Sequence, residues 1–258
     1  MSWSGFKKSM NRAGTSLMQK TGQVEKTIDK QFEEEERRFR RFESNLEKLH
    51  MESRGYLDSV IALTNSQQRI AEVVGKILND ETSVSNPASE RYRQIAIELD
   101  TQVRPELDHN LKATVLDPVG RVIAHFPLIN ETIKRRNNKL LDYDAARTKA
   151  HKLGTKVDDH QKLIKAEAAA LEAQEIYESV NSQLIAEIPR LVDSRLQLLD
   201  PSFEALIKAQ LQFATRASDS YHSMQAHFPI DIRDGEDLDF QVESVMHKMR
   251  DLTICGLV

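Results

Sequence analysis

A run of basic residues in the middle of the chain is the group best suited to binding an anion. It consists of Lys134, Arg135, Arg136 and Lys139. At helical spacing, Lys139 returns one turn later to the side occupied by Lys134 and Arg135, which makes a cationic patch. Such a patch attracts phosphate-bearing surfaces. The alternative is a solvated helix face, and the four residues alone do not decide between the two.

Residues 1–24 have the composition of a helix that lies in a membrane interface. They contain no acidic residue, and their apolar residues recur at steps of three and four. Aromatic residues at the headgroup boundary and cations on anionic lipid are typical of such helices. We therefore predict that Lys7, Lys8 and Arg12 bind lipid. We also predict that four residues insert: Trp3, Phe6, Met10 and Leu17.

Three glycines in this segment each weaken a helix by roughly 1 kcal/mol relative to alanine. They are Gly5, Gly14 and Gly22. We therefore expect the segment to be disordered in water and to fold on a membrane. A plain disordered tail and an organelle transit peptide are the alternatives.

The remaining reactive side chains do not form a catalytic or metal-binding pattern. Asp158-Asp159-His160 and the pair His222 and His227 lack the i,i+4 histidine spacing of a zinc helix, and no glycine-rich phosphate loop exists. Cys255, the single cysteine, excludes an internal disulfide and suits a reducing compartment. We predict no enzymatic activity, no metal and no cofactor.

The element that follows the N-terminal segment is a long helix with a heptad seam. Between Ile28 and Ile77 the apolar residues step alternately by four and three, which predicts about 50 helical residues. A lone helix of that length cannot bury its seam, so it needs partner helices from the same chain or from a second chain. The predicted coiled-coil and dimer seam includes Phe32, Phe39, Phe42, Leu46, Leu49, Tyr56, Val60 and Leu63.

Two further long helical patterns complete the fold class, which is all-α. They run over about residues 89–153 and 163–228, and a polar turn begins at Gly154. Both contain prolines, which remove a backbone hydrogen bond and bend a helix. These are Pro105, Pro118, Pro127, Pro189 and Pro201. We therefore predict three antiparallel helices that form a curved rod.

Composition excludes several classes of protein. Of 258 residues, 29% are charged, and the formal net charge of −4 argues against a general nucleic-acid binder. No run of 18 apolar residues exists that could span a membrane, and no secretory signal is visible. After residue 228 an acidic linker precedes a short amphipathic helix. We divide the chain into residues 1–24, 25–228 and 229–258.

Four segments, taken in order, resemble the BAR (Bin/amphiphysin/Rvs) domain family. They are MSWSGFKKSMNRAG, FEEEERRFRRFESNLEKL, FPLINETIKRRNNKLLDYDAAR and IPRLVDSRLQLL. With its amphipathic N-terminus, the chain is similar to the N-BAR subclass, and most similar to the short fungal Rvs-type members that lack a Src-homology-3 domain.

The resemblance implies a crescent-shaped dimer of kinked three-helix coiled coils, with a six-helix bundle at its centre. It implies a scaffold that senses or generates membrane curvature in endocytosis, at the plasma membrane and the cortical actin cytoskeleton. Lys134, Arg135, Arg136 and Lys139 match the family's concave-face cations. The implied partners are anionic phospholipid and either a second copy or, as an obligate heterodimer, a longer amphiphysin-like BAR protein. Actin-patch proteins are implied only indirectly, and nucleic acid is not implied. A coiled-coil adaptor without lipid binding is the alternative.

Overall fold

The computed structural model describes residues 3–79, 86–155, 160–228 and 235–252 of the chain. Within these residues every regular element is a helix, which confirms the all-α prediction. The chain divides into two compact units. Unit 1 contains Met1–Gly55 and Leu111–Leu206, and unit 2 contains Tyr56–Asn110 and Ile207–Val258.

The two N-terminal helices are α1 (Trp3–Lys20) and α2 (Lys30–Leu78). α2 has 49 residues and matches the long helix expected from the heptad pattern. It begins where the Asp29 carboxylate accepts a hydrogen bond from the Phe32 backbone N–H at 3.0 Å, because the first backbone donors of a helix need an acceptor from outside it.

The second helical pattern is divided at its prolines, as expected. Two short π-helical segments end one residue before the dipeptides Arg104-Pro105 and Asp117-Pro118, and Pro127 lies in the first turn of the last piece. Proline has no N–H to donate, so the backbone must rearrange around each one. The pieces are α3 (Pro87–Glu98), η1 (Leu99–Val103), α4 (Arg104–Leu111), η2 (Lys112–Leu116), α5 (Asp117–Ile123) and α6 (Phe126–Gly154).

The third pattern forms two helices that meet at Ser194, between Pro189 and Pro201. Its elements are α7 (His160–Asp193), α8 (Arg195–His222) and the 3-10 segment η3 (Ser223–His227), followed by the C-terminal helix α9 (Gly235–Arg250). Most of the predicted turn after Gly154, the acidic linker and Cys255 lie outside the described residues.

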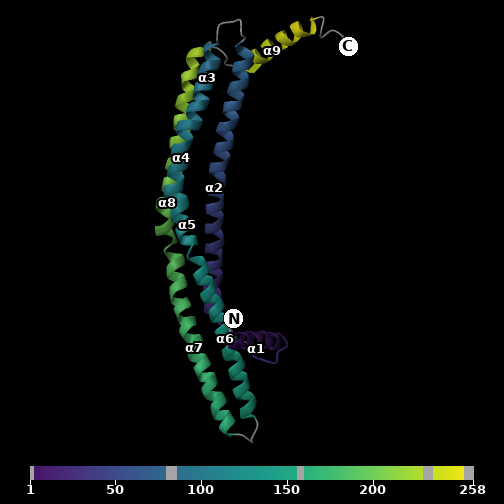
Figure 1. Ribbon diagram of the computed structural model, residues 1–258, viewed down its shortest axis with the longest axis vertical. Helices are drawn as coiled ribbons and strands as arrows, with labels where there is room; N and C mark the ends of the chain where they lie inside the picture. The colour runs from purple at the N-terminus through teal and green to yellow at the C-terminus, as the bar shows by residue number, and fades with distance from the viewer. Residues whose placement is uncertain (1–2, 80–85, 156–159, 229–234, 253–258) are drawn as a thin grey trace. The chain divides into compact units, whose positions relative to one another are not determined.

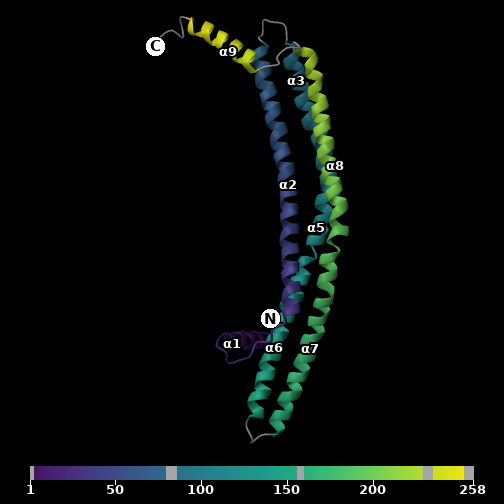
Figure 2. The ribbon, with the colours of Figure 1, turned by 180° about the vertical axis from the view of Figure 1, so that it is seen from behind.

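Unit 1 is built around an aromatic core. The Phe126 ring of α6 meets the rings of Phe39 and Phe42 edge to face, at centroid distances of 5.6 and 5.8 Å. Such pairs add about 0.5–1.5 kcal/mol to the burial of the rings themselves. Aliphatic residues of α7 complete the core: Val180, Leu184, Ile188 and Val192. Figures 1 and 2 both show α6 and α7 side by side along this part of the chain.

Unit 2 has a separate core. Ile95, Leu99 and Val103 are buried along α3 and η1, and Met224 of η3 covers them. Among the described residues of this unit, Thr64 and Ser89 are polar and buried. Thr64 of α2 donates to Asp100 at 2.8 Å, and Asp100 also accepts from Arg104 at 2.8 Å. A buried hydroxyl is tolerated here because its hydrogen bond is made.

Most residues of the predicted seam of α2 face the interior of the chain. Phe32, Phe39, Phe42, Leu46 and Val60 are buried, and Leu49 packs against the core. The last predicted seam residue, Leu63, is 49% exposed.

Apart from Val60, the positions that α2 buries in unit 2 lie one residue after the predicted ones. Leu57, Thr64 and Ala71 are buried, whereas Tyr56 is half-buried and Ile70 is exposed. A straight helix has 3.6 residues per turn and drifts by about 20° per heptad against a strict seven-residue repeat. The side facing the other helices of the chain therefore moves by one position, and the original heptad column turns outward.

A buried polar network joins the three helices of unit 1. Arg136 of α6 is 4% exposed, and its guanidinium lies 3.8 Å from the centroid of the Phe32 ring. It donates to Asn181 at 2.7 Å and to Tyr177 at 2.9 Å, and it pairs with Asp29 at 3.4 Å. Asp29 also accepts from Asn181 at 2.6 Å. A buried charge is stable only with such partners.

The pKa of Asp29 lies below its ordinary value. Burial alone would raise it, but hydrogen bonds from the Phe32 N–H and Asn181, together with the charge of Arg136, outweigh that effect. The folded protein therefore binds a proton at Asp29 less readily than the unfolded chain does. The stabilisation is present above the unfolded pKa of about 3.9 and is lost as the pH falls through the folded value.

We predict that Asp29→Asn lowers the free energy of unfolding at pH 7 by about 1–3 kcal/mol, because it weakens the network around Arg136. The difference from the wild type should shrink below about pH 4. Urea titrations at fixed chain concentration across this pH range measure it, with Asp58→Asn on the exposed side of α2 as the matched control. A difference that does not change with pH would contradict the assignment.

Candidate functional site

α1 presents its apolar stripe to solvent. Trp3 is 83% exposed, and Phe6, Met10 and Leu17 are also exposed. The Trp3 and Phe6 rings lie next to each other, with centroids 6.3 Å apart. The expectation of a disordered tail is wrong for residues 3–20, because they form a helix that contacts α6 (Figure 1).

A shallow cavity of about 430 Å³ lies between α1 and α6. Cations predominate among its lining residues, which are Arg12, Asn130, Glu131, Lys134, Arg135, Asn138 and Lys139. Arg12 comes from α1, and the others come from three successive turns of α6. The structure therefore brings three of the four basic residues of the predicted patch together with a cation of the N-terminal segment.

The cations of this cavity differ in whether they are available to a ligand. Lys134 and Arg135 are exposed and Lys139 is half-buried, and none of the three has a hydrogen bond or ion pair with another described residue. Lys7 and Lys8 on α1 are likewise exposed and unpaired within the part of the chain that the structure describes. These five cations can meet an anion without breaking an existing contact.

Arg136 does not belong to this surface, contrary to the sequence prediction. Its guanidinium is enclosed by Phe32, Tyr177 and Asn181, as described above, and it does not line the cationic cavity. The sequence did contain a signal for this position. Arg136 follows Ile129 and Ile133 at spacings of four and three residues, so it lies on the same side of α6 as these apolar residues. That side faces the core.

Arg12 is engaged rather than free. Its Nε and Nη2 atoms donate to the two carboxylate oxygens of Asp142 at 2.8 and 2.7 Å. Nearby, Asp144 is fully buried and accepts a hydrogen bond from Gln19 of α1 at 2.8 Å. The sequence patterns did not single out either aspartate, because isolated carboxylates on a charged helix carry no periodic signal.

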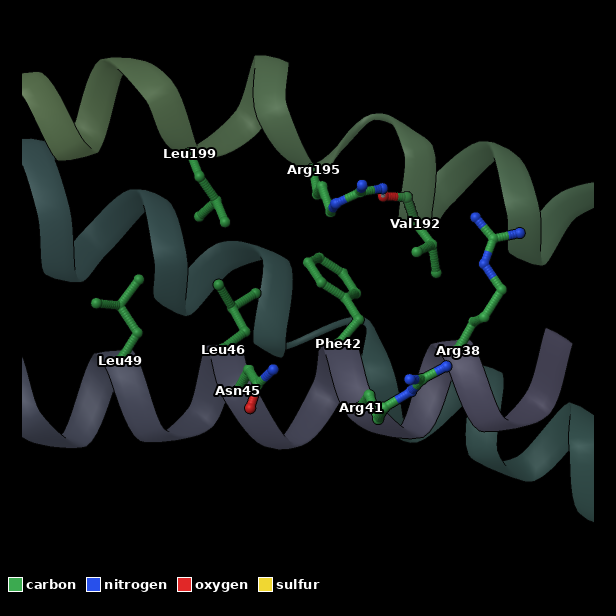
Figure 3. Close-up of a pocket in the computed structure, with 9 residues that line it drawn as sticks. All are labelled: Arg38, Arg41, Phe42, Asn45, Leu46, Leu49, Val192, Arg195 and Leu199. Atoms are coloured by element: carbon green, nitrogen blue, oxygen red, sulfur yellow. Dashed lines mark hydrogen bonds between the residues drawn. The ribbon is translucent and has the colours of Figure 1, made fainter. Parts of the chain in front are cut away.

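A second arginine-lined groove lies on unit 1 between α2 and the α7–α8 pair (Figure 3). It has a volume of about 520 Å³, with Phe42, Leu46 and Leu49 of α2 facing Val192 and Leu199.

The cations of this groove are largely occupied. Arg38 pairs with Glu35 at 2.9 Å and with Asp193 at 2.6 Å, and Arg195 donates to the Val192 carbonyl at 2.9 Å. Because Arg38 and Arg195 already have partners, which leaves Arg41 as the one arginine of the lining without a partner among the described residues, the groove is a weaker anion site than the unpaired cations of α6.

Other kinds of site find no support among the described residues. No group of three histidine, cysteine, aspartate or glutamate side chains there could hold a metal ion. The helices in the same residues are also too short or too polar for any of them to cross a bilayer. Asp158 and Asp159, named above as possible ligands, lie outside the described residues.

Comparisons with known proteins agree with the geometry. The model of the BAR domain matches residues 6–228. The chain is 47% identical to Protein hob3 of Schizosaccharomyces pombe, over all of this chain and 98% of that protein. It is 37% identical to the regulator of cytoskeleton and endocytosis RVS161 of Candida albicans, over all of this chain and 99% of that protein.

The fold is shared with a solved structure, the amphiphysin BAR domain from Drosophila. The TM-score is 0.63 at 24% identity, over 78% of this chain and 92% of that one. With a family model that matches nearly the whole helical region and relatives that match from end to end, the chain belongs to the BAR domain family.

Proposed function

We propose that this chain is a membrane-binding scaffold that senses or generates curvature. It acts in endocytosis and cortical actin organisation, in line with the name of its Candida albicans relative. One observation carries the proposal. α1, which carries an exposed apolar stripe, lies beside unpaired cations of α6, and such a stripe and such cations are the two components of an interfacial membrane site.

The cationic component supplies attraction that depends on salt. Each lysine or arginine near an anionic surface contributes about 1 kcal/mol, and the attraction falls off within about 8–10 Å at physiological ionic strength. Lys134, Arg135 and Lys139, with Lys7 and Lys8 of α1, would therefore bind anionic phospholipid weakly in one chain. A dimer doubles the number of contacts, which makes useful affinity possible.

The apolar component supplies binding that resists salt. Trp3, Phe6, Met10 and Leu17 are exposed to water in the folded chain, and burying an apolar side chain gains about 1.5–3 kcal/mol. Insertion of this stripe at the headgroup boundary would also spread the outer leaflet. We propose that the helix inserts while the α6 cations hold the protein on the surface.

We predict that the triple variant Lys134→Glu, Arg135→Glu, Lys139→Glu loses most of its co-sedimentation with phosphatidylserine-containing vesicles at low salt. The reversal places three negative charges where the wild type attracts phosphate, so the loss should be at least about tenfold. Arg136 stays unchanged because its replacement would disturb the core rather than the surface.

The matched control reverses three exposed and unpaired cations of α2: Arg41, Lys48 and Arg54. It applies the same change of net charge elsewhere on unit 1, so it should retain most of the binding. Equal sedimentation of the wild type and the triple α6 variant would favour the adaptor without lipid binding.

We also propose that the outward heptad column of α2 is the dimer interface. Leu63, Ile70 and Ile77 are spaced by seven residues, and they are 49%, 53% and 73% exposed. A spacing of seven returns to the same side of a helix, so the three form one apolar column. The partner is a second copy of the chain or a longer amphiphysin-like BAR protein.

We predict that Leu63→Asp with Ile70→Asp shifts the chain from dimer to monomer in sedimentation velocity at micromolar concentration, because the charges would be buried without partners. Leu171→Asp, on an exposed position of α7, is the control and should leave the dimer intact. A dimer that persists in the double variant would exclude this column as the interface. A wild-type chain that is monomeric alone would point to the longer partner.

A further inference from the structure

The docked face of α1 and its apolar stripe lie on opposite sides of the helix. At about 100° per residue, Arg12, Thr15 and Gln19 fall on one side, and the stripe from Trp3 to Leu17 falls about 180° away. The burial agrees with this, since Thr15 is buried whereas Trp3 is 83% exposed. The hydrogen bonds of Arg12 and Gln19 with α6 are made along this face, and docking leaves the stripe uncovered.

Two carboxylates of α6 make the contacts that hold this face. Asp142 accepts both hydrogen bonds of a bidentate pair with Arg12, at 2.8 and 2.7 Å. Asp144 accepts from Gln19 at 2.8 Å. Bidentate arginine–carboxylate pairs fix orientation as well as distance. The two contacts lie two turns apart on α1, so they restrict its rotation about its own axis.

The segment between α1 and α2 is held by the same buried carboxylate. Thr27 donates to Asp144 through its backbone N–H at 3.2 Å and through its hydroxyl at 2.6 Å. Arg147 donates to the Glu25 carbonyl at 3.0 Å, and Val24 is buried. Asp144 is fully buried and takes three hydrogen bonds from α1 and this segment, in addition to its ion pair with Arg147 of α6 at 3.6 Å, so its burial is fully compensated only when α1 and the segment are in place.

We infer that Asp142 and Asp144 are positioning residues for α1, and we name the pair the carboxylate anchor. The anchor keeps α1 helical and oriented on α6 before any membrane is met, with its apolar stripe directed away from the protein. Insertion then requires neither folding of a free tail nor release of a buried apolar face, which reduces the conformational entropy lost on binding. The positioning role rests on the proposed membrane function, whereas the docking itself does not.

Hydrogen exchange of the full chain without lipid tests the docking. In the wild type, the α1 amides should exchange at least about tenfold more slowly than in Asp142→Asn or Asp144→Asn, because the variants free the helix to open. The amides of α6 and α7 should be unchanged. Asp58→Asn removes the same charge from an exposed site and should behave as the wild type. Equal exchange of α1 in the wild type and both variants would overturn the inference.

If Asp144→Asn fails to fold, swapping the charges of Arg12 and Asp142 still tests the docking. Arg12→Asp alone should speed exchange of α1, and combining it with Asp142→Arg should restore slow exchange by re-forming the pair with its charges exchanged. A double variant that exchanges as fast as the single one would contradict a direct contact between these two side chains.

Trp3 is the single tryptophan of the chain, so its fluorescence reports on insertion directly. With phosphatidylserine-containing vesicles at moderate salt, its blue shift should require severalfold more lipid in Asp142→Asn than in the wild type. Removing the negative charge of Asp142 would by itself strengthen binding to anionic lipid. A higher lipid requirement of the variant therefore cannot be an effect of charge alone.

The hydrogen-exchange and fluorescence measurements together distinguish a failure of the docking from a failure of the membrane insertion. Slow exchange of α1 without any wild-type blue shift would refute insertion and leave the docking intact. If the wild type and Asp142→Asn need the same amount of lipid for the blue shift although their α1 amides exchange at different rates, the positioning role is refuted.

Discussion

The guanidinium of Arg136 is the contact on which unit 1 depends, because it joins all three of its long helices. It comes from α6, lies on the Phe32 ring of α2, and donates to Tyr177 and Asn181 of α7. A charge this deeply buried is stable only while every partner is present. The orientation of α6 is therefore fixed, and with it the directions of the neighbouring cations. At about 100° per residue, Lys134 and Arg135 must then point to solvent.

The same helix determines where the N-terminal part of the chain lies. Asp29 begins α2 and pairs with Arg136, while Asp144, two turns further along α6, binds Thr27 and Gln19. The carboxylates thus fix both ends of the segment that connects α1 to α2. α6 supplies a buried polar side that holds α1 and an exposed cationic side next to it, and this is why the apolar stripe and the cations occur together.

Much of the fold could be predicted from the sequence. The apolar period gave the bounds of α2 to within a few residues, and the prolines located the interruptions of the second and third patterns. These features are local, since helix propensity and a missing N–H act within a turn or two. The cationic patch and the stripe of α1 were identified for the same reason, because residue type and spacing define them.

The errors arose where the outcome depends on tertiary packing. Arg136 was assigned to the surface by its charge, although its position in the apolar column of α6 places it in the core. The exposure of Leu63 likewise depends on packing, because a straight helix drifts out of a strict heptad register and turns this seam residue outward. The roles of Asp142 and Asp144 depend on partners more than 100 residues away in sequence, and no local pattern reveals them.

The net charge of the chain does not describe the surface that a membrane would meet. Acidic residues outnumber basic ones by 40 to 36, which on its own argues against binding an anionic surface. Screening limits each charge to about 8–10 Å, so only the charges near the contact matter. On α6, Asp142 is paired and Asp144 is turned inward. Lys134, Arg135 and Lys139 have no described partner, and Glu131 is the one carboxylate among the residues that line their cavity. By engaging the carboxylates internally, the fold leaves a locally cationic surface on an acidic protein.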